Sequence, residues 1–170
     1  RLAVMRADID NLGKAFVSGF ESEKNGGKYS TLSRTATFSR KISMFFKLHI
    51  NSILENGSYF LNDNDTGKRY ATIVYSGGDD IFIIGAWDDI IGFAVDLYDS
   101  FTEYSQGTLT ISAGIGIYPK KYPVSVMATE TGELENLSKL HENKNAITLF
   151  GSEFTYSWDR FINNVLEEKY

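Results

Sequence analysis

The chain has 170 residues, 42% of them hydrophobic, so it is long enough to bury one core of ordinary size. Its 17 basic and 22 acidic residues give a formal net charge of -5, which argues against a protein that coats nucleic acid through phosphate contacts. The absence of cysteine excludes disulfides and thiolate metal sites, and a sequence without a membrane-spanning apolar run or a signal-peptide pattern favours a cytoplasmic protein with no membrane partner.

The first half of the chain alternates apolar segments with polar loops that contain glycine. Residues 2–6 predict a buried strand that leads into the acidic residues of ADID, and residues 12–20 predict a helix. After a polar loop at 21–30, apolar residues recur at helical spacing over 31–54, which predicts one long helix. Residues 56–69 are rich in asparagine, aspartate and glycine, and this composition predicts a second loop.

The second half begins with two segments of β-branched and aromatic residues, at 70–75 and 81–85, which are separated by SGGDD. This pattern predicts a β-hairpin with the glycines and aspartates at its tip. The following pattern predicts a helix, a strand, a weaker helix and a short strand, at 87–105, 108–118, 124–140 and 145–150.

The predicted order is βααββαβ followed by a smaller αβ unit, which is typical of an α+β fold with a ferredoxin-like, split βαβ arrangement. In such an arrangement the first and third strands are antiparallel neighbours, and helices cover one face of an antiparallel sheet. We expect residues 1–150 to form this domain and residues 151–170 to form a helical segment that leads into a following domain. Because Arg1 stands directly before a strand, we expect the chain to be part of a longer polypeptide.

Four aspartates are expected to meet at one end of this sheet. Asp8 and Asp10 follow the first strand, and Asp79 and Asp80 lie at the tip of the hairpin beside it. Crowded carboxylates need a compensating cation, and hard oxygen donors without His or Cys favour Mg²⁺ or Mn²⁺. Two such ions are typical of phosphoryl or nucleotidyl transfer. GGDD alone is also what a solvated turn contains, and the second acidic pair is what favours a metal site.

Four segments together carry a resemblance to a known family. They are RADIDNLGKAF, YSGGDDIFIIG, LTISAGIGIY and KNAITLFG. In this order they resemble the second palm, or cyclase-like, domain of the large subunit of type III CRISPR interference complexes of the Csm (III-A) type. The resemblance covers nearly the whole chain and implies a fold related to nucleotidyl cyclases and polymerase palms.

The resemblance also implies an activity. The family converts ATP into cyclic oligoadenylate second messengers, with release of pyrophosphate, when the complex holds guide RNA paired to target RNA. It further implies other Csm-type subunits as partners and a possible pairing with a second palm that completes the nucleotide pocket. The family's cleavage of single-stranded DNA belongs to a separate HD domain, and no His-Asp dipeptide occurs here, so we expect that activity to be absent from this chain.

Carried over by motif, the resemblance implies a metal site with two ions. Asp8, Asp79 and the backbone carbonyl of Ile9 would be ligands. Asp80 would be a further ligand, or would help to deprotonate the attacking ribose hydroxyl. Asp79 and Asp80 are therefore the predicted catalytic pair.

The resemblance implies a second set of residues that bind the nucleotide. They are Gly77, Gly78, Asp10, Asn11, Lys139 and Lys144. The glycines would shape the floor under the ATP triphosphate, and the lysines stand where related cyclases place a phosphate-binding lysine, although a lysine on a helix is often only a solvated charge. Asp10 can instead face away from the site and hold the loop, and Asn11 can instead cap the first helix.

Three other interpretations stay open. A diguanylate cyclase of the GGDEF family uses GTP on a similar palm, but its signature is GG(D/E)EF, and an asparagine that reads guanine lies eight residues after the first metal aspartate. Here Phe16 occupies that place and Asp80 is fourth in the motif, which favours adenine. A template-copying polymerase needs fingers and a thumb that 170 residues do not supply. A non-catalytic palm scaffold would be expected to have lost one of the aspartates.

Overall fold

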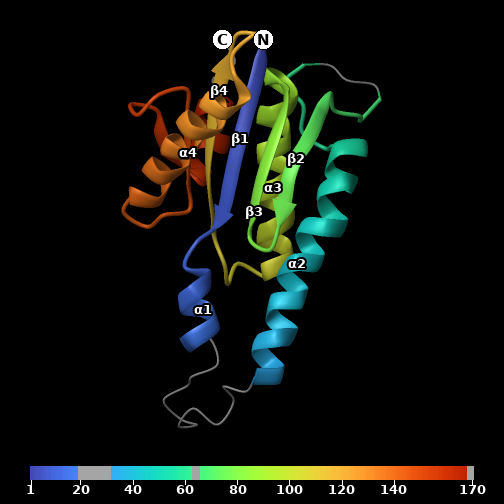
Figure 1. Cartoon of the computed structure of the whole chain (residues 1–170), viewed down its shortest axis with the longest axis vertical. Helices are drawn as coiled ribbons and strands as arrows, with labels where there is room; N and C mark the ends of the chain where they lie inside the picture. The colour runs from blue at the N-terminus through green and yellow to red at the C-terminus, as the bar shows by residue number, and fades with distance from the viewer. Residues whose placement is uncertain (19–31, 63–65, 168–170) are drawn as a thin grey trace.

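The computed structural model of the chain describes residues 1–18, 32–62 and 66–167. Within them one sheet has the strand order β2-β3-β1-β4-β5-β6 (Figure 1). The strands are β1 (Leu2–Ile9), β2 (Ala71–Gly77), β3 (Asp80–Ala86), β4 (Ile111–Tyr118), β5 (Ala146–Leu149) and β6 (Thr155–Ser157). The helices are α1 (Leu12–Ser18), α2 (Leu32–Glu55), α3 (Trp87–Ser105), α4 (Val124–Leu140) and α5 (Trp158–Arg160), which continues as a π-helix, η1 (Phe161–Val165).

The centre of the sheet has the pairing expected of a palm. β1 lies between β3 and β4 and is antiparallel to both. β2 and β3 form the antiparallel hairpin, and α4 connects β4 to β5, which are parallel. The predicted α+β palm, with its first and third strands as antiparallel neighbours, is confirmed.

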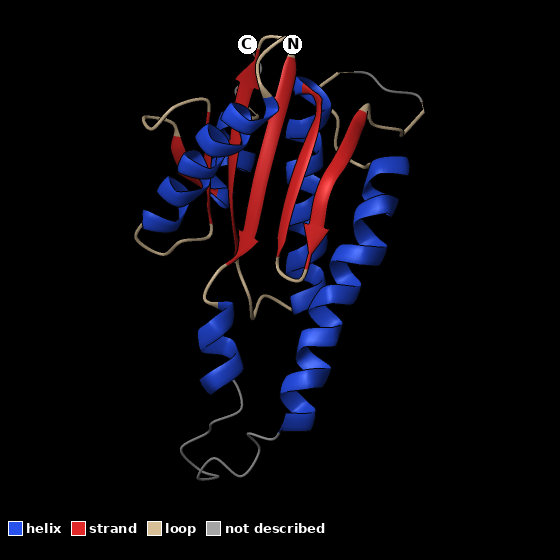
Figure 2. Ribbon diagram, in the orientation of Figure 1, coloured by secondary structure: helices blue, strands red, loops and turns tan. Residues whose placement is uncertain are grey.

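Helices cover both faces of this sheet, and each face has its own core (Figure 2). α2 and α3 lie on one face, where alternate residues of β1 join a large core with Phe45 and Phe93. α4 lies across the opposite face, where Val4, Tyr118 and Met127 form a smaller core. The two long helices before β4 therefore share one face as predicted, and the added αβ unit covers part of the other. None of the described helices is long and apolar enough to cross a membrane.

Three strand boundaries at the acidic end of the sheet extend beyond the prediction, whereas β4 begins at Ile111, later than the predicted residue 108. β1 continues past residue 6 to Ile9, so Asp8 lies inside the ladder. β2 continues to Gly77 and β3 begins at Asp80. The turn between them therefore has two residues, whereas the predicted tip has five. The strands extend because pairing with neighbours satisfies backbone groups that a loop would leave to water.

The end of the described chain differs from the predicted added helix. Residues Thr155–Ser157 form β6 at the sheet edge, and only short helical segments follow. Trp158 and Phe161 are buried in the large core, and the Trp158 indole N–H donates a hydrogen bond to the Ile111 carbonyl at 2.8 Å. This segment therefore belongs to the palm core, whereas a following domain stays a prediction.

Candidate active site

Three aspartates meet where β1 and the hairpin end. Asp8 is the direct antiparallel partner of Asp80, and Asp79 occupies the turn beside them. The Ile9 backbone N–H donates to the Asp79 carbonyl at 3.1 Å, which ties the hairpin tip to β1. Directly opposed residues in such a ladder have Cβ atoms about 4.5–5.5 Å apart. The expected meeting of Asp8 with the GGDD hairpin is therefore confirmed.

The negative charges of this cluster act on one another. Partial burial raises the pKa of Asp80, and the nearby charges of Asp79 and Asp8 raise it further, while the Arg6 cation works in the opposite direction. Like charges that face each other across a sheet are destabilising. The cluster therefore retains a surplus of negative charge that favours the arrival of a cation.

The two glycines of the turn differ in what their positions require of the residue. Gly78 has a φ of +67°, in the left-handed region that glycine adopts without strain. The Asp79 N–H donates to the Gly77 carbonyl at 2.8 Å and closes a γ-turn around Gly78. At Gly77 a Cβ atom would lie 2.7 Å from the Tyr75 hydroxyl oxygen. The turn therefore requires glycine at Gly78, whereas the contact at Gly77 is with the end of the exposed Tyr75 side chain. The role of both glycines under a triphosphate stays a prediction.

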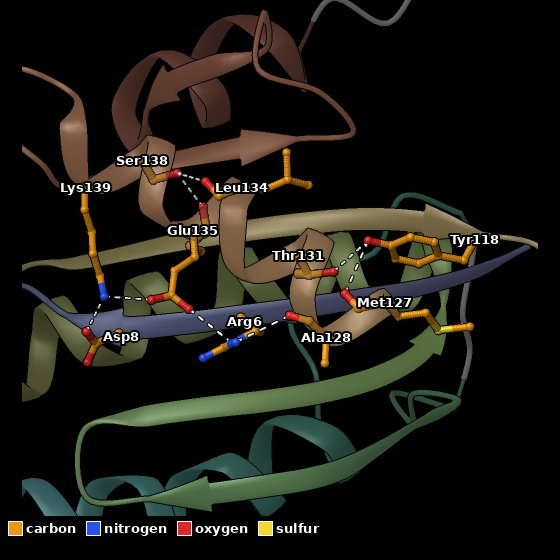
Figure 3. A network of polar contacts seen from close by, with 11 residues as sticks. Arg6, Asp8, Tyr118, Met127, Ala128, Thr131, Leu134, Glu135, Ser138 and Lys139 are labelled. Atoms are coloured by element: carbon orange, nitrogen blue, oxygen red, sulfur yellow. Dashed lines mark hydrogen bonds and ion pairs between the residues drawn. The ribbon is translucent and has the colours of Figure 1, made fainter. Parts of the chain in front are cut away.

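Lys139 reaches the acidic cluster from α4 (Figure 3). Its ammonium nitrogen lies 2.5 Å from Asp8 Oδ2 and 2.7 Å from Glu135 Oε1. Burial lowers the pKa of Lys139, but the hydrogen bonds and charges of Asp8 and Glu135 outweigh it and raise this pKa above its ordinary value. The lysine is therefore a fixed positive charge beside the first predicted metal ligand.

Two charged residues of this network were missed in the sequence-based prediction. Arg6 Nε lies 3.4 Å from Glu135 Oε2, and Arg6 Nη1 donates to the Ala128 carbonyl at 3.4 Å. Glu135 lies between Arg6 and Lys139 (Figure 3). A signal existed for both: Arg6 precedes Asp8 by two residues and so shares its face of the strand, and Glu135 precedes Lys139 by four residues on a helix.

Asp10 faces away from this network. It is buried, and its carboxylate accepts hydrogen bonds from the hydroxyls of Thr110 and Ser112 at 2.8 and 2.7 Å and from the Asn145 N–H at 3.0 Å. These contacts join the end of β1 to the start of β4 and to the loop before β5. The placement matches a residue that holds the loop rather than one that contacts a nucleotide.

Asn11 and Lys144 contact each other beside α1. The Lys144 ammonium donates to Asn11 Oδ1 at 2.7 Å, and the Asn11 backbone carbonyl accepts from the Ala15 N–H at 3.0 Å in the first turn of the helix. Phe16 packs edge-to-face against Phe38, with ring centroids 5.2 Å apart, so its ring joins α1 to α2. A nucleotide-binding role for Asn11 or Lys144 stays a prediction.

The chemistry of the donors fits Mg²⁺ or Mn²⁺. Asp8, Asp79 and Asp80 offer hard carboxylate oxygens with surplus negative charge. In the part of the chain that the structure describes, no three His, Cys, Asp or Glu side chains are arranged so that they could hold a metal ion. Mg²⁺ commonly binds through one or two carboxylates together with substrate phosphates, without an all-protein cage. These residues therefore suit an ion that binds together with a nucleotide, and the number of ions stays a prediction.

Comparison with known proteins identifies relatives of this chain. Residues 1–148 match the family described as Cas10/Cmr2, second palm domain. Over its full length the chain is 52% identical to the CRISPR system single-strand-specific deoxyribonuclease Cas10/Csm1 (subtype III-A) of Mycobacterium tuberculosis. It is 50% identical, over 99% of its length, to the protein of the same name from Streptococcus thermophilus. The chain spans only 21% and 20% of these two relatives.

Solved structures share the fold. The Csm1-Csm4 cassette in complex with cA4 matches 95% of this chain with a TM-score of 0.79 and 32% sequence identity. The same values apply to the cassette in complex with one ATP. In both cases the match covers 23% of the solved chain, so the present chain corresponds to about a quarter of that solved polypeptide.

Proposed function

The chain belongs to the Cas10/Cmr2 second palm domain family, and on this basis we propose that it converts ATP into cyclic oligoadenylates with release of pyrophosphate. The observation that carries the proposal is the pairing of Asp8 with Asp80 beside Asp79, where the chain gathers more negative charge than its own cations compensate. The related Csm1-Csm4 cassettes solved with ATP and with cA4 support a nucleotide substrate and an oligoadenylate product.

In this proposal each residue of the acidic end has a separate task. Asp8, Asp79 and the Ile9 carbonyl would hold the divalent ions, and Asp80 would be a further ligand or would accept the proton of the attacking ribose hydroxyl. The bound ions would activate that hydroxyl and neutralise the triphosphate. Lys139 binds a phosphate oxygen, since its charge already lies beside Asp8. The turn at Gly77 and Gly78 keeps the two hairpin aspartates next to β1.

The proposed partners belong to the whole polypeptide, because this chain spans about a fifth of its curated relatives. We propose that the full-length protein assembles with other Csm-type subunits, guide RNA and target RNA in the cytoplasm. A second palm would complete the nucleotide pocket. Cleavage of single-stranded DNA, named for the relatives, is not assigned to this portion.

The experiment that tests this function is a product assay on the assembled full-length complex with guide RNA, target RNA, ATP and Mg²⁺ or Mn²⁺. Chromatography with mass spectrometry is expected to find cyclic oligoadenylates. Asp79→Asn with Asp80→Asn is expected to lower their formation by roughly a hundredfold or more. Asp99→Asn, an exposed position on α3, removes the same type of charge as a control.

Two results would overturn the proposal. One is an unchanged yield of oligoadenylates from the double variant, which would remove the hairpin aspartates from the site. The other is a parent complex that makes a cyclic dinucleotide from GTP and no product from ATP, which would favour the diguanylate cyclase. A parent with no product from either nucleotide would favour the scaffold.

A further inference from the structure

Glu135 is a buried carboxylate between two cations. Its side chain is 7% exposed, and a glutamate is rarely buried unless it is paired. Oε1 lies 2.7 Å from the Lys139 ammonium nitrogen, and Oε2 lies 3.4 Å from Arg6 Nε (Figure 3). One carboxylate thus faces two positive charges, and one positive charge of the trio remains for Asp8 or for another anion.

We propose that Glu135 is a positioning residue, which holds the Lys139 ammonium at the Asp8 end of the cluster so that it can bind a phosphate of the nucleotide. The inference rests on the proposed function. Without Glu135, Asp8 would be the only partner of this ammonium among the described residues. A cation that takes Asp8 would then release the lysine to solvent, whereas Glu135 keeps it in place.

The packing of α4 fixes Glu135 where it can act in this way. At Gly114 of β4 a Cβ atom would lie 2.4 Å from the Glu135 backbone nitrogen, so the helix approaches the sheet closely at this residue. At Gly132 a Cβ atom would lie 2.8 Å from Arg6 Nη1. One turn further, the Ser138 hydroxyl donates to the Ala113 carbonyl at 2.6 Å. These contacts hold α4 close to β4 and place Glu135 beside Arg6.

The spacing of Glu135 and Lys139 along α4 also favours their pairing. Glu135 stands four residues before Lys139, which is the favourable order for a Glu–Lys pair on a helix. A free lysine side chain loses considerable rotamer freedom when it binds a ligand. The pair restricts that freedom before the nucleotide arrives, and such preorganisation strengthens binding.

If Glu135 only stabilised the fold, its substitution would weaken nucleotide binding equally with and without Lys139. A double-mutant cycle therefore distinguishes this structural role from the positioning role. The variants are Glu135→Gln, Lys139→Ala and the combination, made in the full-length protein. The ligand is α,β-methylene ATP with Mg²⁺, because its α-phosphate cannot release pyrophosphate and only binding is measured. We expect Glu135→Gln to weaken binding by about tenfold in the parent and to have no further effect beside Lys139→Ala.

Two further measurements sharpen the cycle. With ATP as substrate, Glu135→Gln is expected to raise KM more than it lowers kcat, since it acts on the binding of a phosphate. Glu133→Gln removes the same charge from an exposed position of the same helix and is expected to leave binding unchanged. If Glu135→Gln unfolds, Glu135→Asp takes its place, because it keeps the charge but moves it one methylene group away from the lysine.

The outcomes distinguish this inference from the function on which it rests. An equal loss of affinity from Glu135→Gln with and without Lys139 would show that Glu135 does not act through the lysine, as would no loss in the parent. Either result would overturn this inference alone. A parent that fails to bind the analogue would overturn the proposed function together with it.

Discussion

Two ion pairs in this molecule are built in opposite ways. The pair of Arg69 with Asp96 joins the segment before β2 to α3 and is deeply buried. The Asp96 carboxylate also accepts the backbone N–H groups of Ser58 and Tyr59 at 2.8 and 3.0 Å. The Arg69 guanidinium lies 4.3 Å from the centroid of the Phe60 ring. The Arg69 and Asp96 charges therefore neutralise each other, and the chain supplies further partners for both side chains.

The acidic end of the sheet has no such balance. Asp8 pairs with Lys139, which is shared with Glu135, and the charges of Asp8 and Asp79 act on Asp80 instead of being cancelled. Both side chains of the Asp8–Lys139 pair keep about a quarter of their exposure, 24% and 27%. Matched, buried charge therefore stabilises the fold, whereas surplus charge at an accessible edge of the sheet indicates a ligand.

The largest expected effect comes from breaking the matched pair. Asp96→Asn leaves the Arg69 cation buried without its counter-charge, and loss of one partner of a buried pair costs about 3–5 kcal/mol. Urea-induced unfolding of the chain measures this loss. Glu103→Gln, exposed on the same helix, should change the free energy of unfolding by less than about 0.5 kcal/mol. Similar losses in the free energy of unfolding for the two variants would contradict the difference drawn between the buried pair and exposed charges.

A smaller loss of stability is expected at Asp10. Asp10→Ala leaves the donors of Thr110, Ser112 and Asn145 without their buried acceptor, at a cost of about 1–3 kcal/mol. The folded protein should still bind ATP with a divalent ion. If the variant is as stable as the parent and has lost metal-dependent binding, Asp10 belongs with the ligands and the boundary between the two regions is misplaced.

The smallest effect, of opposite sign, is expected at Asp80. Since its pKa is raised in the folded state, its ionisation opposes folding: the cost is absent well below the ordinary value of 3.8 and complete once the pH exceeds the folded pKa. In the presence of a chelator, Asp80→Asn should therefore raise the melting temperature at pH 7 and leave it unchanged at pH 3. A lower melting temperature at pH 7 would mean that this carboxylate is matched after all.

Part of the fold and of the candidate site could be predicted from the sequence. Asp8 and the GGDD hairpin could be placed together because strongly apolar strands flank both, and the order of strands and helices allows few palm topologies. The limits of α3 and α4 followed from helical periodicity and match the structure. The resemblance singled out Lys139, which the structure places beside Asp8.

The remaining features depend on packing that no local pattern encodes. The last residues of β1 look like a loop because they are acidic, yet pairing with β3 and β4 makes them strand. The link from Arg6 to Glu135 exists only because Gly114 lets α4 approach β4 closely. β6 has three residues, too few for a periodic signal, and the burial of Trp158 is what fixes it to the core.

The central claim is that the unmatched carboxylates at the end of β1 and the hairpin bind ATP through a divalent ion. Calorimetric titration of the full-length protein with ATP and with GTP, in Mn²⁺ and in chelator, tests it most directly. We predict binding of ATP that requires Mn²⁺, weaker binding of GTP, and loss of both in Asp79→Asn with Asp80→Asn. Equal ATP binding by the parent and the double variant in Mn²⁺ would contradict the claim.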